Sequence, residues 1–184
     1  MILSTDYVIQ HTENWIRSFI IQLNLCPFAK REVERGRLRI QVSSTSKITE
    51  ALAEFHAELR LLDETRDIET SLVIFPTLLN DFFAYLEFVD LAEDLILAQG
   101  YEGIYQLATF HPDYCFADVD FNDVSNYTNR SPYPMLHLLR EESLEKAIAY
   151  YGDTTKIPEK NVAAMHELGE AAMKKLLVDC VPKD

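Results

Sequence analysis

The sequence LVIFP at Leu72–Pro76 decides the fold that we predict for this chain. A short, continuous apolar run that stops at a proline is typical of a strand buried on both faces, near the middle of a sheet. Sheets with two buried faces are usually parallel and carry helices on both sides. We therefore expect long helices on either side of this run in the sequence.

Those helices are indicated by the spacing of apolar residues. Apolar side chains recur at helical intervals over 48–62 and again over 82–96, where Asn80 is a suitable N-cap. Farther out, apolar and polar residues alternate over 38–42, and 104–110 is predicted as a third strand. The order strand, helix, strand, helix, strand predicts crossover connections and a mostly parallel sheet.

The rest of the chain adds elements at both ends of this unit. We predict further helices over 6–23, 27–35, 131–148 and 158–178, and a fourth strand over 116–121. Ser131 would cap the third of these helices, with Pro132 at its first position. The fold class is α/β: a single domain over 1–184, three or four mostly parallel strands with crossover helices, and extra helices at both ends.

Composition and charge exclude several classes of protein. The formal net charge is −13, which opposes binding to nucleic acid or to anionic membrane surfaces. No apolar run approaches the roughly 20 residues of a membrane-spanning helix, and the N-terminus lacks the pattern of a secretory signal. The three cysteines form no CxxC pair, which favours a reducing, cytoplasmic location.

The segment Thr109–Arg140 concentrates the side chains that could carry chemistry. His111 follows the third predicted strand, and ligand sites of α/β sheets lie beyond the carboxyl ends of strands. His111 and His137 are candidate acid–base catalysts because imidazole titrates near neutral pH. Asp113 could orient His111. The alternative is that both histidines only make structural hydrogen bonds.

A second group in the same segment suggests an anion site. Arg130 is the first cation after Arg66 and directly precedes the predicted helix start at Ser131. A helix N-terminus with a guanidinium beside it can hold a carboxylate or phosphate. The residues that could complete this site are Asn126, Asn129 and Arg140. Alternatively, Arg130 pairs with a nearby aspartate and only fixes the loop.

Cys26 is a further candidate catalytic residue. If Pro27 opens a helix, Cys26 lies at its N-cap, where a lowered thiol pKa would favour a nucleophile. The alternative is an inert, buried thiol.

Metal binding is a separate possibility, for which the candidate ligands are His111, His137, Asp113, Asp118 and Asp120. The HExxH and calcium-loop patterns are absent, and we assign no metal residues.

Three segments together resemble a known family. They are LNLCPFA (23–29), FHPDY (110–114) and TNRSPYPMLHLLRE (128–141). On these motifs the chain resembles the bacterial and plastid family catalogued as domain of unknown function 1415. The resemblance spans nearly the whole chain and implies that these segments are the family's signature. It implies no activity.

Three functional hypotheses follow. The first is an enzyme, a hydrolase or group-transfer catalyst, that acts on a small anionic metabolite with His111 as base and His137 as acid. The second is a non-catalytic binding or homo-oligomerisation module with an aromatic surface. The third is a metalloprotein that uses the same histidines. The sequence does not identify a cofactor.

Overall fold

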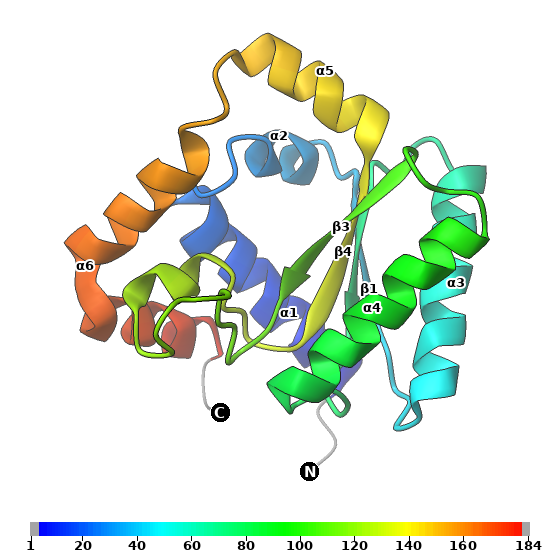
Figure 1. Cartoon of the computed structure of the whole chain (residues 1–184), viewed down its shortest axis with the longest axis horizontal. Helices are drawn as coiled ribbons and strands as arrows, with labels where there is room; N and C mark the ends of the chain where they lie inside the picture. Colours follow the sequence, from blue (N-terminus) through cyan, green and yellow to red (C-terminus); the bar gives the residue numbers. More distant parts are fainter. Residues whose placement is uncertain (1–3, 182–184) are drawn as a thin grey trace.

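The centre of the protein is a four-stranded sheet with the strand order β1-β2-β4-β3 (Figure 1). The computed structural model describes residues 4–181. Its strands are β1 (Leu38–Val42), β2 (Thr70–Ile74), β3 (Tyr105–Phe110) and β4 (Met135–Arg140). β1 pairs parallel to β2, whereas β4 lies between β2 and β3 and is antiparallel to both. β1, β2 and β3 therefore share one direction.

Helices lie on both faces of this sheet and at both ends of the chain. They are α1 (Thr5–Trp15), α2 (Ala29–Glu34), α3 (Ile48–Glu64), α4 (Phe82–Ala98), α5 (Glu141–Tyr151) and α6 (Ile157–Cys180). α1 continues directly into the π-helical segment η1 (Ile16–Ile21), and a 3-10 segment, η2 (Val124–Thr128), follows β3. The predicted α/β class, with crossover helices and terminal helices, is confirmed.

Two apolar cores lie on opposite faces of the sheet, because successive side chains of a strand point to opposite sides. On one face, Val73, Leu136 and Leu138 pack against α3 and α4. On the other face, Leu72, Ile74 and Met135 pack against α1, η1 and α6. His137 lies two residues after Met135 in β4 and so belongs to this second face.

The sheet is mixed rather than mostly parallel in its pairing, and the reason is β4. A helix was predicted over 131–148, but residues 135–140 form this strand and the helix begins only at Glu141. The run Met135–Leu139 is apolar enough to be buried in either form, and periodicity alone does not distinguish the two. Hydrogen bonding to β2 on one side and to β3 on the other decides for the strand.

Two other predicted elements, and the cap of a third, differ from the observed structure. Residues 116–121 form turns instead of a strand, with Asp118 at a positive φ of 61°. The first helix begins at Thr5 and becomes π-helical over Ile16–Ile21, where the Gln22 N–H donates to the Arg17 carbonyl at 3.1 Å, five residues back. The N-cap of α4 is Asp81, one residue after the predicted Asn80.

Candidate functional site

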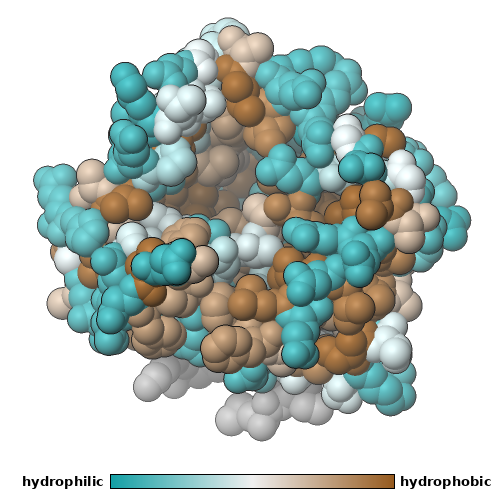
Figure 2. Space-filling view, viewed as in Figure 1, coloured by the Kyte–Doolittle hydropathy of each residue, from teal (hydrophilic) through white to brown (hydrophobic). Residues whose placement is uncertain are grey.

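A large pocket opens on the α1 and α6 face of the sheet. Its volume is about 790 Å³, and its floor is formed by side chains from all four strands, including Leu38, Leu72, Phe110 and His137. η1, α2, α5 and α6 provide the walls. Figure 2 shows this face hollowed, with brown, apolar residues inside the hollow. The dimensions and lining are those of a small-molecule site.

The pocket exists because α5 does not pack down onto the sheet. Leu144, Ala147 and Tyr151 share one face of α5 and line the pocket, yet none of the residues of α5 is buried. The clearest aromatic contact of this helix with the opposite wall is between Tyr151 and Phe28, whose rings meet edge to face at 5.8 Å. The apolar face of α5 thus covers a cavity instead of a filled core.

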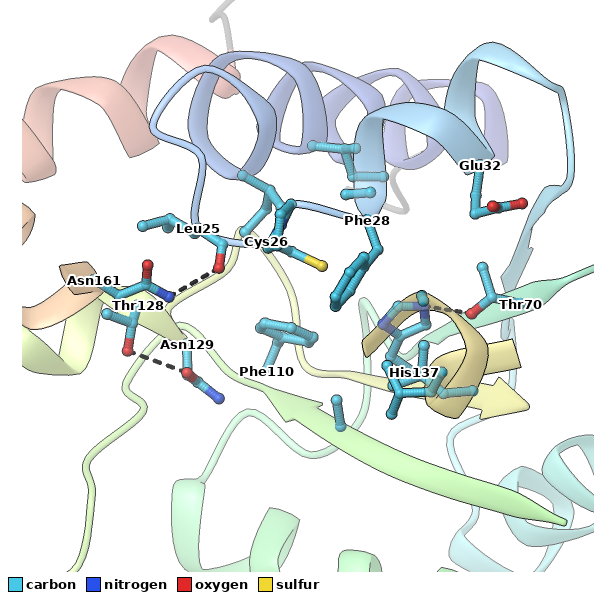
Figure 3. Close-up of a pocket in the computed structure, with 18 of the residues that line it drawn as sticks. Leu25, Cys26, Phe28, Glu32, Thr70, Phe110, Thr128, Asn129, His137 and Asn161 are labelled. Carbon is cyan, nitrogen blue, oxygen red and sulfur yellow. Dashed lines mark hydrogen bonds between the residues drawn. The ribbon is translucent and has the colours of Figure 1, made fainter. Parts of the chain in front are cut away.

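The polar groups of the pocket lie at its two ends. Figure 3 shows Glu32, Thr70 and His137 at one end and Thr128, Asn129 and Asn161 at the other. Between them lie Cys26, Phe28 and Phe110. At the second end the polar side chains bond to the protein: Asn161 donates to the Leu25 carbonyl at 2.8 Å, and Asn129 donates to the Thr109 carbonyl at 3.0 Å.

His137 is the titratable side chain of the pocket whose environment shifts its pKa most. Its Nε2 lies 2.5 Å from the Thr70 hydroxyl, which in turn donates to the Leu138 carbonyl at 2.6 Å. Burial lowers the pKa of His137 from its ordinary 6.5 to about 4. The ring is therefore neutral at physiological pH and can accept a proton or a hydrogen bond.

Two carboxylates lie near His137 in the lining. Glu32 and Glu69 both contact Arg37, through a 3.7 Å approach of Glu32 Oε2 to Nη1 and a direct hydrogen bond between Glu69 and Nη2. Within residues 4–181, Glu32 Oε2 and Glu69 Oε1 are buried and accept no hydrogen bond. Arg37 is thus shared between two acids, and Glu32 also contacts Arg31, which lines the pocket as well. The charges at this end are therefore paired.

The basic stretch at 30–39 is paired with acidic side chains where the structure describes its contacts. Arg31 contacts Glu32 at 3.0 Å, Arg39 contacts Glu58 at 2.5 Å, and Lys30 lies 3.8 Å from Glu34. Four of the five cations of this stretch are thus offset by carboxylates.

Cys26 lines the pocket but does not cap a helix. α2 begins at Ala29 and its N-cap is Phe28. Burial raises the pKa of the Cys26 thiol above its ordinary value, and this effect exceeds the opposing effect of the backbone N–H groups of Phe28 and Ala29. The predicted lowering of the thiol pKa is therefore wrong, since the apolar walls of the pocket disfavour the thiolate.

His111 lies outside the pocket lining, and both of its ring nitrogens are used by the fold. The side chain is fully buried. Nδ1 accepts a hydrogen bond from the backbone N–H of Asp113 at 2.9 Å, so Nε2 carries the proton and donates to the Leu79 carbonyl at 3.0 Å. Burial lowers the pKa of His111. The Asp113 side chain is exposed, and only its backbone contacts this imidazole.

Arg130 and Asn126 hold the loop that follows β3. The Arg130 guanidinium lies over the rings of Tyr127 and Phe121 and donates to the Phe121 carbonyl at 2.8 Å. Asn126 accepts from the Phe116 N–H and donates to the carbonyls of Asp120 and Phe121. All of these partners belong to the protein, so the two side chains act as internal braces.

The predicted anion site lacks its helix. Ser131 lies in an irregular segment, and its hydroxyl donates to the Tyr133 carbonyl at 2.7 Å instead of capping a helix. Arg140 lines the pocket, but its guanidinium donates to the carbonyls of Leu62, Thr65 and Ile68 near the end of α3. The helix that begins here is α5, whose N-cap is Arg140 itself, and the guanidinium of this residue is bonded to those carbonyls.

The predicted site residues thus fall into two groups. The HPD and NRSP segments do meet: the His111 N–H donates to the Asn129 carbonyl at 3.2 Å, and the Ser131 N–H donates to the His111 carbonyl at 3.4 Å. They form a closed corner that contains His111, Asn126, Arg130 and Ser131. The predicted residues that line the pocket are Cys26, Asn129, His137 and Arg140.

Sequence reasoning missed Glu32, Glu69 and Thr70 as pocket residues. Glu69 immediately precedes β2 and Thr70 is its first residue, and an acidic and a hydroxyl side chain at the start of a buried strand were an unused signal. Within residues 4–181, no group of three or more His, Cys, Asp or Glu side chains is arranged to hold a metal. Across the same residues, none of the helices has the length and apolar character needed to span a membrane.

The comparisons with known proteins give a family and no activity. A family model described as a protein of unknown function (DUF1415) matches residues 7–175. This match agrees with the family predicted from the three sequence motifs. Neither the curated proteins nor the solved structures contain a significant match.

Proposed function

Since the chain belongs to the DUF1415 family of proteins of unknown function, which brings no activity with it, we propose from the geometry that it binds a small, mainly apolar molecule in the pocket under α5. The observation that supports this function most directly is an apolar pocket of about 790 Å³ on the sheet. Specific ligand sites are typically concave, mostly apolar and furnished with a few polar groups.

The polar groups of the lining argue for a neutral ligand rather than the anionic metabolite expected from the sequence. Glu32 and Glu69 carry the negative charge of the His137 end, and Arg31 and Arg37 are already paired with them. The guanidinium of Arg140 is engaged by backbone carbonyls. An anion would enter this pocket without a free cation to receive it.

Catalysis on the bound molecule, by hydrolysis or group transfer, stays a prediction. It would involve Cys26 and His137, the two catalytic candidates that line the pocket. The raised pKa of the Cys26 thiol makes it a weak nucleophile unless a base removes its proton. Binding is therefore the function that the geometry supports best.

The binding proposal can be tested by filling the pocket from α5. Ala147 lines the pocket, whereas Ala149 lies two residues further along the same helix, is exposed and is not part of the lining. Substituting Ala147→Trp places an indole in the cavity and should weaken binding of the neutral fluorescent probe N-phenyl-1-naphthylamine at least tenfold. The matched Ala149→Trp variant should bind like the unmodified protein.

Fluorescence titration with equilibrium competition measures both affinities. Equal affinities for the two tryptophan variants, or no saturable binding to the unmodified protein, would contradict the proposal. Circular dichroism melting of each variant checks that the fold is retained.

A further inference from the structure

We propose that the ligand of this pocket presents a hydrogen-bond donor, a hydroxyl or an N–H group, to Nδ1 of His137. This inference rests on the proposed function and specifies the class of ligand. It follows from the position of one proton, which the hydrogen bonds around Thr70 determine.

The Thr70 hydroxyl has one proton and two neighbours that could receive it. The Leu138 carbonyl, 2.6 Å away, can only accept a hydrogen bond. The hydroxyl proton therefore points to this carbonyl. The oxygen of Thr70 then offers a lone pair to His137 Nε2 at 2.5 Å, so Nε2 must carry a proton and donate.

A neutral imidazole carries one proton, so Nδ1 of His137 is left with a lone pair. Burial lowers the pKa of His137 to about 4, which keeps the ring neutral at physiological pH. Across residues 4–181, the hydrogen bonding of this side chain ends at Thr70. Nδ1 is thus an acceptor that the surrounding protein does not satisfy.

The surroundings of the ring direct this acceptor toward a ligand. Figure 3 shows His137 between Thr70 on one side and the rings of Phe28 and Phe110 on the other. The Phe110 ring lies 6.3 Å from the imidazole, centroid to centroid. These rings cannot donate a conventional hydrogen bond, so a polar contact to Nδ1 must come from the occupant of the pocket.

The same arrangement sets the specificity. A site built around an acceptor favours ligands that carry a donor and rejects analogues in which the donor is blocked, because the acceptor would then be buried without a partner. The carboxylates of Glu32 and Glu69 in the lining act in the same sense, since they also favour donors over acceptors. We expect aromatic alcohols, phenols and amines to bind better than their ethers.

A matched pair of probes tests this preference. 2-Naphthol and 2-methoxynaphthalene have the same ring system, and only the former can donate. Fluorescence or calorimetric titration of the unmodified protein should show about tenfold tighter binding of 2-naphthol, the effect of one buried hydrogen bond. His137→Phe should bind both probes with similar affinity, whereas His166→Phe, which alters an exposed histidine of α6, should keep the preference.

The outcomes separate this inference from the binding proposal. Equal binding of both probes to the unmodified protein overturns the donor inference and leaves the pocket proposal standing. Binding of neither probe overturns both. Nitrogen-15 spectra of labelled protein without ligand provide a second measurement: a proton on Nε2 of His137 supports the inference, and a proton on Nδ1 overturns it.

Discussion

The closed corner and the pocket use similar residues and differ in what they leave unused. At the closed corner, both nitrogens of His111 are hydrogen-bonded, and Arg130 donates to backbone carbonyls. In the pocket, one nitrogen of His137 is hydrogen-bonded, and the other has no partner among residues 4–181. Side chains that complete their hydrogen bonds within the fold stabilise it, whereas a polar atom without a partner beside a cavity is available to a ligand.

The largest effect should come from disrupting the closed corner. His111→Ala removes a fully buried ring and leaves the Leu79 carbonyl and the Asp113 N–H without their partner. We expect the free energy of unfolding to fall by about 4 kcal/mol, the sum of a cavity and lost hydrogen bonds. Urea unfolding measures the loss.

The exposed His166 provides the control for this substitution. His166→Ala should change stability by less than about 0.5 kcal/mol. A similar small loss for His111→Ala would mean that the corner does not depend on its histidine, and the contrast between the two regions would not hold.

An intermediate effect should appear in the pH dependence of stability. The pKa of His137 is about 4 in the folded protein and about 6.5 when unfolded, so the unfolded chain binds more protons between these values. Stability should therefore be complete above about pH 6.5 and should fall as the pH falls toward 4. His111, whose pKa is also lowered, acts in the same direction.

The contribution of His137 can be isolated by comparing variants. Allowing for its partial exposure, we expect about 2 kcal/mol of the decrease between pH 7 and pH 4 to disappear in His137→Gln. Urea unfolding at a series of pH values provides the comparison. Parallel curves for the two proteins would refute the assigned role of His137 burial.

The smallest effect should come from the rim of the pocket. Tyr151→Ala removes the edge-to-face contact with Phe28 across the opening. No residue of α5 is buried, so we expect a loss of about 1 kcal/mol or less. Tyr150 is 95% exposed, and Tyr150→Ala should have almost no effect. A loss above about 3 kcal/mol for Tyr151→Ala would show that α5 is as firmly held as the corner.

Much of the fold could be predicted because its signals are local. The apolar run of β2, the alternation in β1 and the helical periodicity of α3 and α4 each lie within one element, and all four were predicted close to their observed bounds. β4 was missed because its apolar run is compatible with a helix. Its pairing with β3 and with β2, the latter more than 60 residues earlier in the chain, selects a strand.

The pocket was harder to predict because its lining residues come from all four strands and from helices that are distant in the sequence. The HPD and NRSP segments were expected to meet, and they do, but the sequence does not reveal that backbone carbonyls already accept hydrogen bonds from His111 and Arg130. His137 was predicted as a candidate on a helix. Its position opposite Leu72 of β2, two residues from Thr70, follows only from the register of the sheet.

The placement of β4 has a consequence for synthesis of the protein. β2 is followed by about 60 residues before β4 leaves the ribosome, and until then the edge of β2 that pairs with β4 has no strand beside it. Pairings so distant in sequence form slowly, and unpaired apolar edges promote aggregation. The nascent chain therefore depends on α3, α4 and β1 to shield β2 until the fourth strand arrives.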